Sequence, residues 1–320
     1  MDKYFKNSLE LEIYNVGYYQ EGESIVLFIK TDGIVVFCLV IDGYRVNNVN
    51  LSKKILIGKN IETVNMFCWS HPDLDHSLGV DDFIPFLSEE SSIILSYGYE
   101  KSIDKWENAN IKMNQMICKE LGKRLSIKKR IDVRTVHEGM SLYQQKFVDV
   151  RNSFEYKCDI SVFSPFSRMI LNRVVNNKDI ENNIMSVGLC VKIGEKSIVL
   201  CSDVPDVVFN NLREDDFPEF VDYLKIPHHG SINGSIVIRK IKNTPDIASM
   251  TVFTNNNLPN SEVIKEYRKK VNQVFCTNDL SKNKQDTFFG IHKCIYRIDK
   301  VDNKSNMVSN YLYGNATEIE

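Results

Sequence analysis

The sequence has little of three things: long apolar runs, paired cysteines and histidines. No run approaches the ~18 consecutive apolar residues that a membrane span requires, and MDKYFKNSLELEIYNV at the start lacks the apolar core of a signal peptide. The eight cysteines lie singly, mostly inside apolar runs such as IVVFCLVI, where a free cysteine behaves as a small hydrophobic side chain. These absences argue against a membrane protein and against a disulfide framework, and we expect a cytoplasmic protein.

The sequence also has no large excess of charge of either sign. Forty Lys and Arg oppose 42 Asp and Glu, a formal net charge of −2, which argues against a protein that coats nucleic acid by charge alone. Residues 101–134 depart from this average, because ten Lys or Arg against four Asp or Glu give them a local charge of +6. Such a run is most often a solvated helix face. The alternative is a platform for an anionic substrate, with Lys128, Lys129 and Arg130 as substrate contacts.

Short β-branched runs dominate both halves of the chain, with helical patterns between several of them. LELEIYNV, ESIVLFIKT and GIVVFCLVID open the chain, and CDISVFSP, SVGLCVKI and KSIVLCSD repeat the style in the second half. Because no Pro/Ser-rich linker separates the halves, we expect an α/β layered sandwich in a single domain over residues 1–301. A helical basic insertion near 101–134 and a frayed polar tail over 302–320 complete the predicted organisation.

Four of the six histidines fall in two short clusters, each directly after an apolar strand candidate: His71-Pro-Asp73-Leu-Asp75-His76 and His228-His229-Gly-Ser. Asp203 stands at the exit of a third apolar run, KSIVLCSD. Strand ends that bring histidine and aspartate to one edge of a sheet make a metal site, and these ligands suit Zn, Mn or Fe. Alternatively, DLDHS caps the next helix, which would explain one cluster but not three. His137 and His292 are isolated, and we interpret both as structural.

The first motif resembles the HxHxDH metal motif of the metallo-β-lactamase fold superfamily. Its aspartate at the second position, within SHPDLDH, is similar to the variant in the soluble domain of ComEC-type competence DNA-uptake channels. NNIMSVGLCVKIGEKSIVLCSDV resembles the strand pair of that family that ends at a bridging aspartate, and YLKIPHHGS is close to its HHGS signature. The resemblance covers roughly residues 10–280. It implies a metallo-β-lactamase-like four-layer αββα sandwich.

The resemblance also implies a ligand set for one or two divalent transition-metal ions, Zn or Mn. The implied ligands are His71, Asp73, Asp75, His76, Asp203 and His228. The first two lie around one ion and the others around the second, with Asp203 bridging both. Asp75 would also orient the attacking water or return a proton to the leaving group. His229 is a candidate for substrate contact or proton transfer, or equally for a packing role, and Ser231 is a candidate substrate contact.

The motifs leave three functions open. The first is a phosphodiesterase or nuclease that cleaves DNA or RNA with metal-activated water, because two metal ions stabilise the attacking and leaving oxygens of such a displacement. The second is hydrolysis of a small ester, lactone or cyclic nucleotide. The third is a metal-poor binding or effector subunit, because Asn182, Asn183 and Ser186 stand where many hydrolases of the superfamily have another histidine. The expected partners are nucleic acid or another phosphodiester, with no membrane, and a regulatory protein or second copy of the chain.

Overall fold

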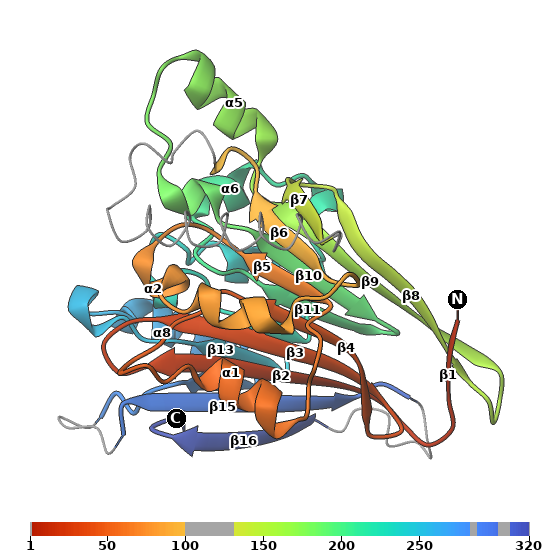
Figure 1. The fold of residues 1–320 in the computed structure, drawn as a ribbon. Helices are drawn as coiled ribbons and strands as arrows, with labels where there is room; N and C mark the ends of the chain where they lie inside the picture. The colour runs from red at the N-terminus through yellow and green to blue at the C-terminus, as the bar shows by residue number, and fades with distance from the viewer. Residues whose placement is uncertain (1, 100–130, 282–286, 300–307, 320) are drawn as a thin grey trace.

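Two β-sheets packed face to face form the centre of the molecule, and helices cover the outer face of each sheet (Figure 1). The computed structural model describes residues 2–99, 131–281, 287–299 and 308–319. Within these residues, the two sheets contain eight and nine strands.

The first sheet has its strands in the order β16 (Val308–Gly314), β15 (Phe289–Arg297), β2 (Leu9–Tyr18), β3 (Glu23–Thr31), β4 (Ile34–Ile41), β5 (Met66–Trp69), β6 (Ser92–Ser96) and β7 (Asp132–Val136). From β16 to β4 neighbouring strands are antiparallel, and from β4 to β7 they are parallel.

The second sheet has the order β1 (Lys3–Phe5), β8 (Ser141–Asp149), β9 (Phe154–Ser164), β10 (Gly188–Ile193), β11 (Lys196–Leu200), β12 (Tyr223–Lys225), β13 (Ile247–Met250), β14 (Gln273–Cys276) and β17 (Thr317–Glu318). Strands β8 to β11 are antiparallel and β11 to β14 are parallel. Each sheet therefore joins an antiparallel half to a parallel half. The carboxyl ends of parallel strands meet at one edge, where loops can gather polar side chains.

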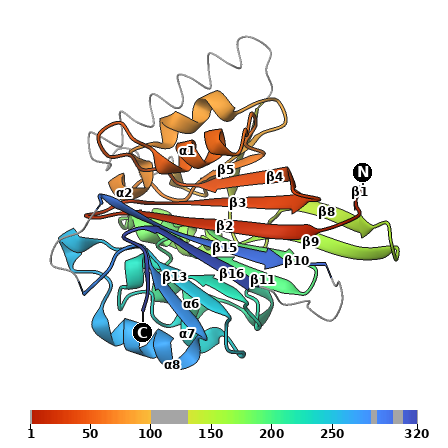
Figure 2. The same ribbon diagram turned by 90° about the horizontal axis from the view of Figure 1, so that it is seen from below.

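The outer helices form two layers on opposite sides of the sheets (Figure 2). The first sheet is covered by α1 (Leu51–Gly58) and η1 (Val80–Phe86), with α2 (Leu74–Ser77) between β5 and η1. The second sheet is covered by α6 (Asp206–Asn211), α7 (Val237–Lys240) and α8 (Ser261–Lys270). The remaining helices described are α5 (Ser167–Val175), η3 (Asn182–Met185), η4 (Glu214–Asp216), η5 (His228–Gly230) and η6 (Thr254–Asn256). The predicted four-layer α/β sandwich is confirmed.

The apolar runs form strands because most of them are buried on both faces. In β2, Leu11 and Ile13 pack in the core between the sheets, whereas Tyr14 and Val16 pack beneath α1. Successive side chains point to opposite faces of a strand, so a strand covered on both sides has no need of polar positions. Seven of the eight cysteines lie in described residues, where they are buried free thiols.

The structure corrects the expected tail. Residues 308–314 pair with β15 in the first sheet, and 317–318 pair with β14 in the second, so the described tail is ordered strand rather than a frayed end. The predicted helical insertion lies outside the described residues except for 131–134, which lead into and begin β7. In the described parts of the chain, no helix is long and apolar enough to cross a membrane.

Candidate metal centre

Three strand ends bring the predicted motifs together. Asp75 and His76 lie on α2, just after β5 of the first sheet. Asp203 lies just after β11, and His229 lies in η5 after β12, both strands of the second sheet. The site therefore spans the junction between the two sheets, and each sheet supplies part of it.

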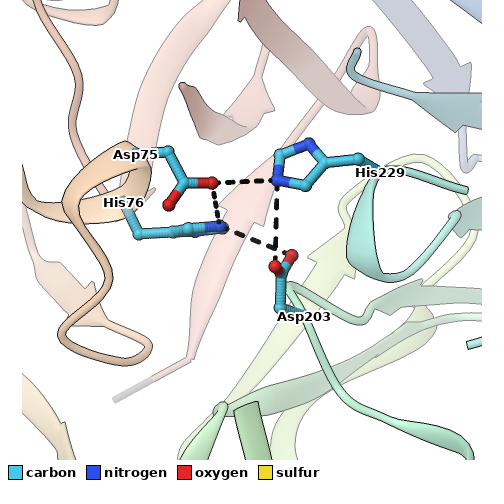
Figure 3. Close-up of side chains that lie close together, drawn as sticks. All are labelled: Asp75, His76, Asp203 and His229. Carbon is cyan, nitrogen blue, oxygen red and sulfur yellow. Dashed lines mark hydrogen bonds and ion pairs between the residues drawn. The ribbon is translucent and has the colours of Figure 1, made fainter. Parts of the chain in front are cut away.

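The four side chains point toward one another in a buried cluster (Figure 3). His76 Nε2 lies 3.3 Å from Asp75 Oδ2 and 3.4 Å from Asp203 Oδ1. His229 Nε2 lies 3.0 Å from Asp75 Oδ2 and 3.8 Å from Asp203 Oδ2. One atom from each of the four residues lies within 4.8 Å of the others. Two imidazoles and two carboxylates in this arrangement form a compact set of transition-metal ligands.

His71 and Asp73 adjoin this cluster. The His71 ring lies 4.3 Å from the His76 ring, centroid to centroid, and His71 Nε2 lies 3.4 Å from Asp73 Oδ2. Asp73 precedes α2, but its side chain makes no capping bond to that helix. It accepts a hydrogen bond from the Asn182 side chain instead, at 2.5 Å. The side chain of Asp73 therefore does not cap α2, and the helix-capping interpretation of the first motif is wrong at this residue.

Asp42, which the sequence motifs did not single out, binds His76 directly and His71 through Ser70, on the Nδ1 side of each ring. His76 Nδ1 donates to Asp42 Oδ2 at 2.8 Å, since a carboxylate only accepts. The Ser70 hydroxyl also donates to Asp42, at 2.6 Å, so its oxygen can accept from His71 Nδ1 at 2.9 Å. A proton on Nδ1 leaves Nε2 as the nitrogen through which each ring can bind a metal ion; for His71, both Ser70 and Ser186 lie within hydrogen-bond distance of Nδ1. A carboxylate behind a ligand histidine fixes its tautomer in this way.

A buried ion pair lies deeper, behind His229. Lys225 Nζ is 2.8 Å from Glu23 Oε2, and both side chains are almost completely inaccessible to solvent. Burial by itself would raise the pKa of Glu23, but the Lys225 ammonium and the nearby histidines offset this effect and lower it. Neither residue was selected from the sequence. The available signal was a charged residue inside an otherwise apolar run, as in YLKIP.

Four residues at the site have a left-handed backbone conformation, which residues other than glycine rarely adopt. Asp42, Ser202, His228 and His229 have φ angles of 57°, 45°, 50° and 52°. In this left-handed region the Cβ atom crowds the backbone, at a cost of about 1 to 2 kcal/mol per residue. Such residues gather at binding and catalytic sites, where the surrounding structure holds them in place.

The charge balance at the site fits a divalent cation. Five carboxylates surround the three buried histidines: those of Glu23, Asp42, Asp73, Asp75 and Asp203. Among the described ion pairs, Lys225 is their one ammonium partner. Moreover, His71 Nε2, His76 Nε2 and Asp203 Oδ1 are buried atoms that make no hydrogen bond within the described residues. A bound metal ion would supply both the missing positive charge and the missing partner.

The pKa shifts have the same origin. Burial would lower the pKa of His76, but Asp75, Asp203 and Asp42 raise it well above its ordinary value. Burial would raise the pKa of Asp203, yet His229 and His76 hold it well below its usual range. Both shifts favour the charged forms, a protonated imidazole and an ionised carboxylate, and a bound cation would replace the histidine protons in that balance.

The structure favours one of two adjacent histidines, a choice that the sequence leaves open. His229, not His228, lies in the cluster, because consecutive left-handed residues turn the two imidazoles in different directions. The side chain of His228 is 21% exposed, its Nε2 lies 4.0 Å from Asp203 Oδ2, and it contacts the Asn183 amide at 3.3 Å. The Ser231 hydroxyl accepts from the Asn233 N–H at 3.2 Å, within its own loop.

The remaining sequence-selected residues lie apart from the cluster. Lys128, Lys129 and Arg130 are outside the described residues. His292 is fully buried against Phe275, whereas His137 is partly exposed and its Nδ1 contacts the Glu138 carbonyl oxygen. These two histidines therefore have separate surroundings from the four that were selected.

Comparison with known proteins finds likeness only among solved structures. No family model matches the chain, and no curated protein does. A diphosphatase from the PhnP family is 13% identical, over 78% of this chain and 92% of that one, with a TM-score of 0.37. The hydrolase AbOPH of the beta lactamase superfamily is 8% identical, over 63% and 74%, with a TM-score of 0.34. A histidine-to-aspartate mutant of the flavo di-iron protein from Thermotoga maritima is 10% identical, over 81% and 50%, with a TM-score of 0.29.

Proposed function

We propose that this protein is a metal-dependent hydrolase of the metallo-β-lactamase fold superfamily. The observation that carries the proposal is the convergence of Asp75, His76, Asp203 and His229, in which His76 Nε2 and Asp203 Oδ1 are buried and make no hydrogen bond within the described part of the chain. Such a donor set suits a divalent transition ion. A bound ion would make water a nucleophile near neutral pH and neutralise charge on a substrate oxygen.

Each side chain has a distinct task in this proposal. His76 and His229 would hold the ion through Nε2, and Asp203, whose Oδ1 faces His76 and whose Oδ2 faces His229, would hold it through a carboxylate oxygen; His71 and Asp73 adjoin these groups as a second candidate ligand pair. Asp75, 3.0 Å from His229 Nε2, is the group that orients water and returns a proton to the leaving oxygen. Asp73 adds a hard oxygen donor, which favours Mn²⁺ more than an all-imidazole site would, and Zn²⁺ remains a second candidate.

For the substrate, we propose a phosphodiester. Asp203 contacts His76 through Oδ1 and His229 through Oδ2. If Asp203 shares two metal ions, as the sequence motifs imply, the pair would suit an in-line displacement at phosphorus because it would stabilise both the attacking and the leaving oxygen. A nucleic-acid substrate would gain further attraction from the +6 charge of residues 101–134. The support for the narrower ComEC-type resemblance, and for nuclease activity, comes from the sequence motifs alone.

Metal analysis and hydrolysis assays test this proposal separately. Purified protein should hold one to two equivalents of transition metal by elemental analysis, a number taken from the two ligand groups. With Mn²⁺ or Zn²⁺ it should cleave bis(p-nitrophenyl) phosphate, and degradation of single- and double-stranded DNA and RNA tests the nuclease activity. Asp203→Asn should abolish turnover, whereas His137→Ala, at a histidine outside the cluster, should not change it.

The outcomes distinguish the three functions. Turnover of small diesters without degradation of polymers would select a small-molecule phosphodiesterase. Metal binding with no diester hydrolysis would contradict the phosphodiester assignment. Wild-type protein that binds no metal would contradict the hydrolase proposal and favour a non-catalytic subunit.

A further inference from the structure

His229 is held from behind by a chain of buried polar groups that runs across both sheets. Its Nδ1 lies 2.8 Å from Thr251 Oγ1, just beyond the end of β13. The Thr251 hydroxyl hydrogen-bonds to Glu23 Oε2, at the start of β3, and Lys225 Nζ lies 2.8 Å from the same oxygen. All four side chains are buried.

The direction of each hydrogen bond in this chain follows from chemistry. The Glu23 carboxylate has no hydrogen to give, so it accepts from the Lys225 ammonium and from the Thr251 hydroxyl. Because the hydroxyl hydrogen is committed to Glu23, the Thr251 oxygen can only accept from His229. His229 must therefore carry a hydrogen on Nδ1. Nε2 faces Asp75 and Asp203, and at 3.0 Å from Asp75 Oδ2 it too donates a hydrogen; a metal ion bound at Nε2 would take the place of that hydrogen, while Nδ1 keeps its own.

The ion pair explains how a carboxylate can sit here without disturbing the site. Glu23 Oε2 is only 3.5 Å from His229 Nδ1, and Glu23 Oε1 is 4.0 Å from His76 Nδ1. An unpaired carboxylate at this depth would be very costly to bury. Lys225 cancels its charge, so Glu23 can orient the Thr251 hydroxyl while the pair as a whole stays neutral.

We propose that Thr251 and Glu23 are positioning residues that hold His229 in the tautomer needed to bind metal through Nε2, with Lys225 as their charge partner. This inference rests on the proposed function only in requiring a metal at the cluster. The groups that set a ligand histidine from behind typically change metal affinity by about 10- to 100-fold when removed. Thr251 and Glu23 perform for His229 the task that Asp42 performs for His76.

Two substitutions at one position separate hydrogen bonding from packing. Thr251→Val keeps the size and shape of the side chain but removes the hydroxyl, and we expect it to weaken Zn²⁺ binding about 10- to 100-fold. Thr251→Ser keeps the hydroxyl and removes a methyl group, and it should bind Zn²⁺ like the wild type. Affinity is measured on the full chain by competition with a chromophoric chelator. The ¹⁵N spectrum of histidine-labelled, zinc-loaded protein should show an Nδ1–H, Nε2-bound ring for His229 in the wild type and Thr251→Ser.

Three results would overturn the inference. One is a Thr251→Val variant with wild-type affinity and an unchanged ¹⁵N spectrum. Another is equal weakening by Thr251→Ser and Thr251→Val, which would assign the effect to packing. The third is coordination of wild-type His229 through Nδ1. None of these readouts needs turnover, so a protein that binds zinc but hydrolyses no diester would contradict the phosphodiester assignment and leave the role of Thr251 fully testable.

Discussion

His229 Nε2 lies 3.0 Å from Asp75 Oδ2, whereas the Nε2 atom of the adjacent His228 comes no closer than 4.0 Å to Asp203 in the ion pairs described. The two histidines are consecutive, yet one faces the cluster and the other faces Asn183 at its margin. Loss of a group that only supports a ligand histidine weakens metal binding about 10- to 100-fold. We therefore expect His229→Ala, which removes the imidazole itself, to weaken it by at least that much. His228→Ala should retain the wild-type metal content. Elemental analysis after dialysis measures both variants, and loss of metal from His228→Ala alone would reverse the assignment.

Asp42 should be nearly as important for metal binding as the ligands. Asp42→Asn keeps the size of the side chain, but its amide cannot accept from His76 Nδ1 and from Ser70 as a carboxylate does. Metal affinity should fall about 10- to 100-fold. Competition with a chelator measures the affinity. Asp159→Asn is the matched control, because Asp159 pairs with Ser141 and Gln144 on β8 and should not affect the metal; equal effects of the two variants would argue against a special role for Asp42.

Removing one member of the buried ion pair should destabilise the fold. Lys225→Met leaves the Glu23 carboxylate buried without its ammonium, which should cost about 3 to 5 kcal/mol in the free energy of unfolding. The double variant Lys225→Met, Glu23→Gln removes both charges and should recover much of that loss. Urea denaturation of chelator-treated protein measures each value.

An exposed pair provides the control for this experiment. Lys265 and Glu262 lie on the surface of α8, and surface pairs contribute at most about 1 kcal/mol. Lys265→Met should therefore have little effect. A similar loss in Lys225→Met and Lys265→Met would mean that burial of the Glu23 pair adds nothing.

His292 should make the fold sensitive to acid. It is fully buried, stacks on Phe275 with ring centroids 4.1 Å apart, and contacts Ser249 and Asn310. Burial lowers its pKa to about 4. An unfolded chain, with an ordinary histidine pKa near 6.5, binds the proton more readily between these two values. Stability should therefore be intact above pH 6.5 and fall as the pH drops toward 4.

The contribution of His292 to this loss can be isolated. A pKa difference between 6.5 and about 4 corresponds to about 3 kcal/mol of unfolding free energy. The His292→Gln variant has no titrating group at this position. Between pH 6.5 and 4 it should therefore lose less unfolding free energy than the wild type, by up to about 3 kcal/mol. Denaturation curves at several pH values test this, and identical pH slopes for both proteins would contradict it.

The fold was predictable because its strands are short apolar runs with buried faces, and the motif order pointed to one arrangement of layers. The described tail was not predictable from the same signal. Val308–Gly314 mixes polar and aromatic residues, and its strand forms only because β15 offers a pairing edge. That pairing depends on tertiary structure, which no local pattern reports.

The candidate site was predictable where a candidate ligand stands at a strand exit, as Asp75, His76 and Asp203 do. Asp42 gives the same signal at the end of GIVVFCLVID and could have been found by applying the rule there. The choice of His229 over His228 was not accessible, since it depends on left-handed backbone angles at both residues. Glu23 and Lys225 are 202 residues apart, and only folding reveals that each charge is the other's partner.

The two ends of the described chain close the same sheet, with β1 at one margin of the nine-stranded sheet and β17 at the other. An exposed edge strand presents unpaired backbone donors and acceptors to other protein chains, and aggregation commonly begins there. Trimming either end for crystallisation would uncover β8 or β14. Both β1 and β17 should therefore be kept when the protein is shortened elsewhere, and their removal should lower the yield of soluble protein.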